Sequence, residues 1–300
     1  MMPEQDKQHF GGTEWAMTLM TSLVWGASFL FIAIALDHVN TGVIPMMRTF
    51  FGFLALLCIP RARVMIQRED MKTVFFLSLI WMAAPFYLYP LAAHTVSSSV
   101  VGMINGALPA LTVVVTAIMT RRRPTRQRVT AVLVGFSGIA LISFSSITDN
   151  ASASVHGIFF LLLALLGYAV AVNIALPLNA KYGATATMMW VEGAAFIWTL
   201  PLGLPALRGS EFTGSAIAAL LILGAIGTGI TFAVYSALQT RAGVVRAMIG
   251  TLFTPVVATI LGVIFRDEHV TVLAIIGMFI VIIGAFLTSR PEKLAISTAL

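Results

Sequence analysis

The chain has 300 residues, of which 59% are hydrophobic and 10% are charged, and its formal net charge is +6. Since a soluble domain usually carries about 25% charged residues, these charges are too few to cover a water-facing globule. The composition therefore excludes an ordinary soluble protein and indicates a surface that faces lipid. A single cysteine, Cys58, excludes an intramolecular disulfide and disfavours a cysteine-based metal site.

The N-terminal residues 1–15 are mostly polar, and the apolar segment that follows is too long for the apolar part of a cleaved signal peptide. We expect this segment to remain as the first of ten membrane spans. A span needs roughly 20 apolar residues to cross a hydrocarbon core about 30 Å thick. The candidate spans lie at 15–30, 42–60, 73–92, 98–119, 129–147, 157–178, 186–207, 215–238, 247–265 and 270–289.

These spans are expected to be helices, because lipid offers no hydrogen-bond partners to an unpaired backbone. The alternation typical of a membrane β-barrel is absent from stretches such as "ALLILGAIGTGITFAVYSAL" at 219–238. Short connections leave no room for an inserted soluble domain. The sequence thus predicts an all-α polytopic membrane protein with ten transmembrane helices.

Positive charge is distributed unevenly between the predicted loops, and "TRRRPTRQR" at 120–128 alone holds five arginines. If the N-terminus is inside, 15 of the 18 lysines and arginines lie on the inner side, Arg208 and Arg266 lie outside, and Arg48 falls within a span. Cytoplasmic loops carry the excess of positive residues, so we predict a bacterial inner-membrane protein with both termini cytoplasmic. The arginine loop is interpreted as an orientation signal that touches anionic lipid, and no nucleic-acid partner is expected.

The two halves of the chain share identical residues at a constant offset of 146 positions. This repetition predicts a first five-helix repeat at 1–150 and a second at 151–300. Because each half has an odd number of spans, the second repeat is inverted relative to the first, as in transporters that work by alternating access around a site near the membrane midplane. The matched pairs are Pro109 with Pro255, Tyr89 with Tyr235, Ile118 with Ile264, Gly138 with Gly284, Leu141 with Leu287 and Ser143 with Ser289.

Four segments carry a resemblance to the drug/metabolite transporter superfamily, in its ten-span form with two EamA-type repeats. They are "WGASFLFIAIAL" (25–36), "YPLAAHTVSSSVVGMINGALPALTVVV" (89–115), "YSALQTRAGVVRAMIGTLFTPVVATILGVIFRDEHVT" (235–271) and "GMFIVIIGAFL" (277–287). The chain most resembles the bacterial amino-acid exporters, including the aromatic amino-acid exporter, which implies a substrate of that class. The family often places an acidic residue in the loop after the fourth span of each half; Glu268 fits this pattern, whereas the first half has Arg122.

Aromatic and polar residues near the middle of the spans are the candidate substrate-binding residues. Aromatic rings usually collect at membrane interfaces, so rings at the midplane are interpreted as the wall of a cavity for apolar side chains, with Asn and Thr supplying polar contacts. Ordinary helix packing is the alternative for each of them. The predicted set is Trp25, Ser28, Trp81, Phe86, Tyr89, Asn105, Tyr168, Thr228 and Thr231.

Prolines and charges within spans supply two further predictions. Proline removes a helical hydrogen bond and kinks the helix, so the matched Pro109 and Pro255 are predicted to act in hinge movement or gating, with a purely architectural role as the alternative. Exposed helix ends and freed carbonyls can bind a zwitterion without a charged side chain. Arg48 and Glu192 lie about six residues from opposite membrane faces, and we expect them to snorkel to the interface or to pair structurally.

These observations favour an exporter of aromatic and other neutral amino acids and related metabolites. Because the first and sixth spans contain no deep carboxylate, facilitated export is preferred to proton coupling. A proton-coupled drug or nucleotide-sugar carrier is the main alternative; a nucleotide-sugar carrier is disfavoured because no lysine or arginine is expected deep in a span. An integral membrane enzyme is a weaker alternative, since no HExxH, GxSxG or P-loop motif is present. No catalytic residue, metal or cofactor is predicted, and the oligomeric state is left open.

Overall fold

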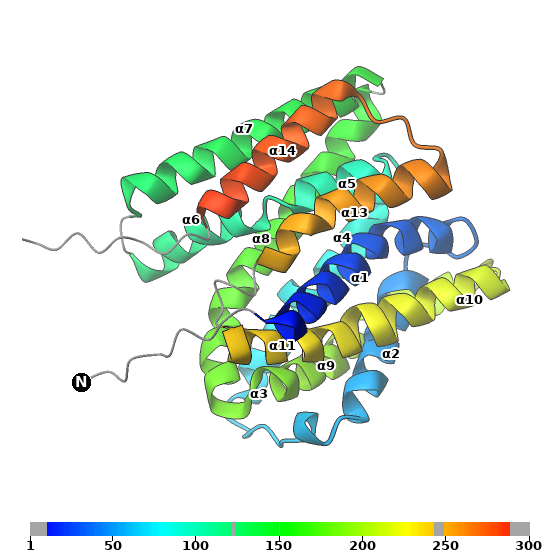
Figure 1. The fold of residues 1–300 in the computed structure, drawn as a ribbon. Helices are drawn as coiled ribbons and strands as arrows, with labels where there is room; N and C mark the ends of the chain where they lie inside the picture. Colours follow the sequence, from blue (N-terminus) through cyan, green and yellow to red (C-terminus); the bar gives the residue numbers. More distant parts are fainter. Residues whose placement is uncertain (1–10, 122–123, 150, 243–248, 289–300) are drawn as a thin grey trace, which may run out of the picture.

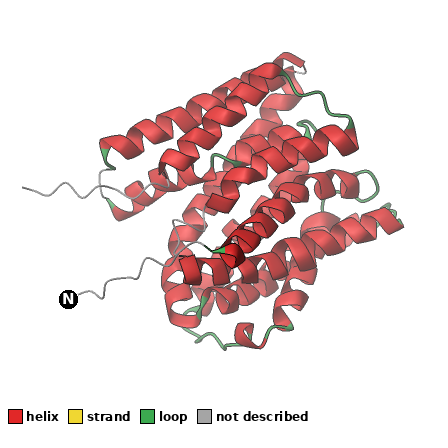
Figure 2. Ribbon diagram, viewed as in Figure 1, coloured by secondary structure: helices red, strands yellow, loops and turns green. Residues whose placement is uncertain are grey.

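The computed structural model describes residues 11–121, 124–149, 151–242 and 249–288. Throughout these ranges the chain forms helices joined by short loops, and no strand is present (Figure 2). Many large apolar side chains remain exposed on the outside of the bundle, among them Phe159, Ile264 and Val272. An apolar exterior of this kind fits a lipid-facing surface, and the all-α class predicted from composition is confirmed.

The helices of the first half begin with α1 (Gly12–Leu36), which is long enough to span a membrane without a break. Two later spans in this half are composite, because each consists of consecutive helical segments. The remaining elements are α2 (Val43–Leu57), the 3-10 turn η1 (Pro60–Ala62), α3 (Met71–Ser78), the π-helical η2 (Leu79–Ala83), α4 (Ala84–Ala93), α5 (Ser98–Asn105), α6 (Leu108–Thr120) and α7 (Arg126–Asp149).

The second half also begins with a long helix and contains a composite span, formed by α10, η3 and α11. Its longest helix, α8, follows α7 after one residue and crosses the bundle obliquely (Figure 1). The elements are α8 (Ala151–Tyr182), α9 (Ala184–Ala206), α10 (Gly214–Leu221), the π-helical η3 (Ile222–Ile230), α11 (Thr231–Ala242), α13 (Ile249–Arg266) and α14 (Val272–Thr288).

Five helices of the described chain are long and apolar enough to cross a membrane, or six when α5 and α6 are taken as one span bent by 40°. Three further apolar helices are shorter: Val43–Leu57, Thr251–Arg266 and Val272–Leu287. The structure therefore shows a multi-pass α-helical membrane protein. The count of ten spans stays a prediction, as do the repeat boundary at residue 150 and the cytoplasmic placement of the termini.

Helix α1 lies between α13 on one side and the consecutive segments α10, η3 and α11 on the other. Helices α7 and α14 lie together at one edge of the bundle (Figure 1). On the opposite side, α2 packs between η3 and α9. Gly224 of η3 allows the close approach to α2, since a Cβ there would lie 2.6 Å from the Cβ of Phe51 and 2.9 Å from the carbonyl oxygen of Arg48. This contact places the middle of η3 directly beside Arg48.

Glycines also bring α7 and α14 into backbone contact. A Cβ on Gly138 would lie 2.6 Å from the carbonyl oxygen of Gly277, and one on Gly284 would lie 3.0 Å from that of Ala131. Positions 138 and 284 differ by 146, as do positions 131 and 277, so the two contacts are equivalent under the offset found in the sequence. From the first contact to the second, the residue number falls from 138 to 131 in α7 and rises from 277 to 284 in α14, so the two helices are antiparallel. An inverted repeat requires this relation.

Gly284→Ala is expected to destabilise the bundle by about 1–3 kcal/mol, because its Cβ would lie 2.5 Å from the backbone nitrogen of Gly135. Gly214→Ala is the matched control, since a Cβ there meets nothing within 4 Å. Thermal unfolding of the detergent-solubilised protein should show a lower midpoint for the first variant and little change for the second. Equal midpoints would contradict tight α7–α14 packing.

Candidate functional site

Arg48 and Glu192 lie inside the bundle, which corrects the expectation that they snorkel to the membrane faces. Arg48 of α2 is 9% exposed and Glu192 of α9 is fully buried. The Nε of Arg48 donates to the hydroxyl of Thr228 at 3.1 Å, and its guanidinium carbon lies 3.8 Å from the centroid of the Phe86 ring. Arg48 lies near the start of α2, as the sequence predicted, but its side chain packs against Thr228 of η3 and Phe86 of α4, so the bundle encloses it instead of leaving it free to reach the interface.

Glu192 is buried without a hydrogen-bond partner on either carboxyl oxygen. Its Oε2 atom faces Gly52 of α2, where a Cβ would lie 3.4 Å from Oε2 and 3.2 Å from the Thr228 side chain. Arg48 and Tyr168 interact with it electrostatically, but neither forms a direct hydrogen bond or ion pair with it. The alternative expectation of a close structural ion pair is therefore not met.

A first aromatic cluster surrounds Trp25 of α1. Its ring centroid lies 5.8 Å from that of Phe232 and 5.0 Å from that of Tyr235, both on α11. The ring of Trp81, in the π-helical η2, meets Phe232 edge-on at 5.9 Å. Phe232 thus brings together two predicted site residues that lie 56 positions apart in the sequence.

A second aromatic cluster joins three further predicted residues. The rings of Tyr89 on α4 and Tyr168 on α8 are stacked with centroids 6.0 Å apart, and the Tyr89 hydroxyl donates to the side-chain oxygen of Asn105. Phe29 of α1 also contacts Tyr89, with centroids 5.7 Å apart. Because Arg48 interacts electrostatically with both tyrosines, this cluster adjoins the guanidinium group.

The hydroxyl groups among the predicted residues have partners in their own helices. Ser28 donates to the carbonyl oxygen of Val24, Thr228 to that of Leu223 and Thr231 to that of Ile226. The last two bonds span five residues, as the π-helical geometry of η3 requires. These three residues are buried, so packing describes Ser28 and Thr231, whereas Thr228 also holds Arg48.

Four side chains, called the central layer below, carry a polar group that has no partner among the described residues; three of them keep accessible surface, whereas Arg48 is buried. Each of these groups is a hydrogen-bond donor or, for the Tyr168 hydroxyl, able to act as one. They are the indole N–H of Trp81, the amide NH2 of Asn105, the hydroxyl of Tyr168 and the terminal nitrogens of Arg48. By contrast, the indole N–H of Trp25 donates to the carbonyl oxygen of Gly227 at 3.0 Å.

The predicted hinge prolines lie at one break in the bundle. Pro109 is near the start of α6, just after the bend that separates α5 from α6. Pro255 of α13 packs against Gly106 in that bend, where a Cβ would lie 2.6 Å from the proline Cγ. A movement of α13 relative to α5 would therefore act on the bend directly, although the hinge role itself stays a prediction.

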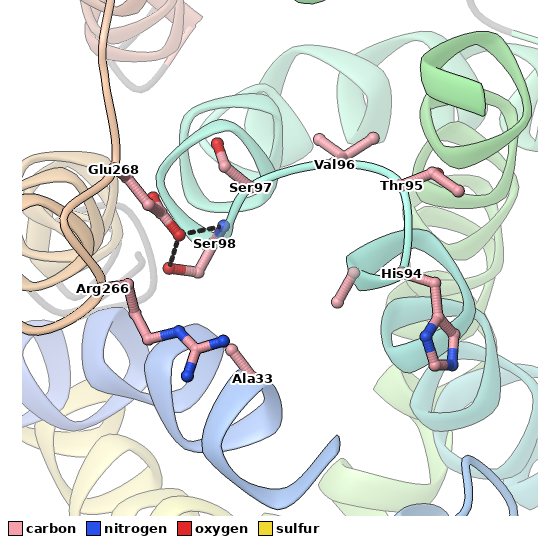
Figure 3. A pocket seen from close by; sticks show the side chains of 9 residues that line it. Ala33, His94, Thr95, Val96, Ser97, Ser98, Arg266 and Glu268 are labelled. Carbon is pink, nitrogen blue, oxygen red and sulfur yellow. Dashed lines mark hydrogen bonds between the residues drawn. The ribbon is translucent and has the colours of Figure 1, made fainter. Parts of the chain in front are cut away.

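A cavity of about 330 Å³ lies away from these clusters, at the end of the bundle where α4 leads into α5 (Figure 3). None of the predicted substrate-binding residues lines it. At its edge Glu268 accepts hydrogen bonds from the backbone N–H groups of Ser98 and Ser99, both at 2.8 Å, and from both hydroxyls. Glu268 thus binds the N-terminus of α5, where a helix favours negative charge.

The opposite end of the bundle carries a charged contact between α8 and the start of α3. Lys181 lies 2.8 Å from a carboxyl oxygen of Asp70, which also accepts from the Tyr182 hydroxyl. The hydrogen bond from Lys181, and next that from Tyr182, lower the pKa of Asp70. Stability from this contact is present above the ordinary pKa of the carboxyl group and is lost as the pH falls through the lowered value.

Sequence reasoning missed the most unusual members of this site. Phe232 and Tyr235 were not in the predicted set, although Tyr235 is the repeat partner of Tyr89. Glu192 and Arg48 were recognised as charges within spans but were expected to snorkel to the membrane faces or to pair structurally, and the structure instead buries both without a direct contact between them. The signal that could have found them is electrostatic. Charged residues inside a membrane cost less free energy when an opposite charge is nearby, so the two opposite charges within spans could have been expected close to one another.

Comparison with known proteins identifies the family. The model of the EamA-like transporter family matches this chain twice, at residues 14–144 and 155–290. The transporter YoaV of Bacillus subtilis, described as uncharacterized, is 21% identical over 90% of this chain and 94% of its own length. An uncharacterized transporter of Archaeoglobus fulgidus is 22% identical over 92% of this chain and 99% of its own. A solved crystal structure shares the fold, with a TM-score of 0.62 and 17% identity over 91% of this chain and 95% of that chain.

Glu268→Gln is expected to lower the thermal unfolding midpoint, because the neutral amide has only one oxygen to accept the bonds that two carboxylate oxygens now accept. A hydrogen bond to a charged group contributes about 1.5–3 kcal/mol. Glu211→Gln is the control, since the exposed Glu211 side chain makes no such contact in the described structure. A midpoint as high as that of the control would show that Glu268 does not stabilise α5.

Proposed function

Because the chain belongs to the EamA-like transporter family, we propose that this membrane transporter exports aromatic and other neutral amino acids and related metabolites by alternating access. The proposed setting is the bacterial inner membrane, with both termini in the cytoplasm and substrate bound between the two repeats. The relatives named above support transport in general, and the substrate class is inferred from the central layer.

The observation that carries the proposal is the set of unpaired donors beside stacked aromatic rings. Trp81, Asn105, Tyr168 and Arg48 offer N–H and O–H groups with no acceptor among the described residues. A substrate carboxylate supplies two acceptor oxygens for such donors. The rings of Trp81 and Tyr168 keep accessible surface, and each packs on a further ring, Phe232 or Tyr89, so they offer apolar faces to an aromatic or aliphatic side chain.

Alternating access is supported by two features of the helix packing. The antiparallel contact of α7 with α14, repeated at an offset of 146 positions, suits two similar units that exchange inward-open and outward-open arrangements. The contact of Pro255 with Gly106 links one unit to the bend in the other. A proline kink beside a bent helix is a suitable place for a small rotation.

A nucleotide-sugar carrier is the second candidate, because Arg48 removes the reason for disfavouring it. The guanidinium lies inside the bundle, and its terminal nitrogens have no partner among the described residues, so they could donate to a phosphate. Among the described residues, Arg48 is the only lysine or arginine buried in the bundle, so it supplies a single positive charge. A single carboxylate therefore matches the net charge of the layer better than a diphosphate does.

Counterflow in proteoliposomes tests the proposal directly. Liposomes containing the purified protein and unlabelled phenylalanine, leucine, a nucleotide sugar or a cationic drug are diluted into trace labelled compound of the same kind. We expect transient accumulation of phenylalanine and, to a smaller extent, leucine, with none in protein-free liposomes. Accumulation of the nucleotide sugar alone would support the second candidate and contradict export of amino acids.

A matched pair of tyrosine variants tests the donor set. Tyr168→Phe removes a hydroxyl without a protein partner, so we expect a KM for phenylalanine about threefold to tenfold higher with an unchanged unfolding midpoint. Tyr89→Phe removes the donor to Asn105 and is expected to lower the midpoint. Initial rates of phenylalanine uptake and thermal unfolding provide the two measurements. An unaltered KM in Tyr168→Phe would exclude its hydroxyl from the binding site.

A further inference from the structure

We propose that Glu192 is a proton-binding site of this transporter and that Arg48 is the group that receives its charge when the proton leaves. The inference rests on the proposed function only for the identity of the transported substrate. Two observations support it. The carboxyl group of Glu192 has no hydrogen-bond donor around it, and the nearby cation, Arg48, makes no ion pair with it.

Burial without a donor favours the neutral acid in the arrangement observed. An ionised carboxylate in an apolar interior costs far more free energy than a neutral one unless a counter-charge or donors contact it. Glu192 is fully buried, and both oxygens lack partners. Among the described residues, no other buried carboxyl oxygen lacks a hydrogen-bond partner, so Glu192 is the only carboxyl group that is buried without one.

The groups that face Glu192 come from the helices packed around α9. Arg48 approaches from α2 and Tyr168 from α8, and both interact with Glu192 electrostatically. The side chains of Thr228 of η3 and Glu192 both lie against Gly52. The Thr228 hydroxyl accepts a hydrogen bond from Arg48 and donates one to the carbonyl oxygen of Leu223. The other charged or titratable groups on these helices lie near helix ends or, for Tyr235, against Trp25; they are Arg61, Lys72, His156, Lys181, Tyr182 and Arg241.

Loss of the proton changes which contacts of Arg48 are favourable. When Glu192 releases its proton to water on one side of the membrane, the carboxylate is left beside a single cation. Pairing requires Arg48 and Glu192 to approach, and Arg48 then moves away from the Phe86 ring and the Thr228 hydroxyl. Rebinding of a proton from the other side restores the present arrangement, so each cycle can move one proton.

Two neighbouring residues of η3 connect Arg48 with the first aromatic cluster. Arg48 donates to Thr228, and the adjacent residue Gly227 accepts the indole N–H of Trp25. Both residues belong to η3, a π-helical segment, and such segments are frequent at functional sites. A change in the Arg48–Thr228 bond therefore acts on the residue next to the one that holds Trp25, and this connection couples the proton to the proposed substrate site.

Infrared spectroscopy tests the proton site without any substrate. We expect the protein in liposomes at neutral pH to show the C=O stretching band of a protonated carboxyl group that Glu192→Gln lacks and Glu211→Gln retains. Absence of any such difference at all pH values studied would overturn the proposal, because Glu192 would then stay ionised. If Glu192→Gln does not fold, Glu192→Asp must shift the band instead, and an unshifted band would equally overturn it.

Transport of phenylalanine provides the second measurement. For exchange of one proton against one substrate, a pH gradient should change wild-type accumulation by up to about tenfold per pH unit. Glu192→Gln should retain counterflow and lose this dependence, while a gradient response that persists in the variant contradicts the proposal. If the wild type does not transport phenylalanine, the proposed substrate class fails, and the infrared result alone decides whether Glu192 binds a proton.

Discussion

The constraint on which this structure depends is that polar groups inside a membrane protein must find partners within the protein. Hydroxyl groups along the spans meet it locally, as when Thr49 donates to the carbonyl oxygen of Pro45 and Thr259 to that of Pro255. Against this background of satisfied groups, a side chain without a partner marks a place where a ligand or an ion can supply one.

The same constraint separates the predicted site residues into two groups with different physical roles. Trp25, Ser28, Tyr89, Thr228 and Thr231 have their polar groups bonded to the protein and therefore shape the layer. Trp81, Asn105 and Tyr168 keep unpaired groups and accessible surface. Residue type and span depth alone could not make this distinction, since both groups contain a tryptophan and a tyrosine.

The helical class and the family resemblance followed from composition, repeated positions and sequence motifs, because lipid imposes simple requirements on length and hydropathy. The 146-residue offset also anticipated which positions of α7 and α14 are equivalent in their contact. Depth within the bundle was harder to predict, since it depends on where a helix starts and how it packs. Arg48 illustrates this: its helix begins at Val43, close to the predicted residue 42, but the packing of α2 against η3 buries the side chain against Thr228, which the sequence did not indicate.

Arg48 and Glu192 also change the interpretation of the transport mechanism. Facilitated export was preferred because no carboxylate was expected deep in the first or sixth span, and that criterion looked for acidic residues only where related carriers place them. A carboxyl group on α9 meets the same physical requirement if it is buried, protonatable and close to a movable cation. Charge neutrality of the layer, more than the identity of the helix that supplies the acid, is then what decides whether a proton accompanies the substrate.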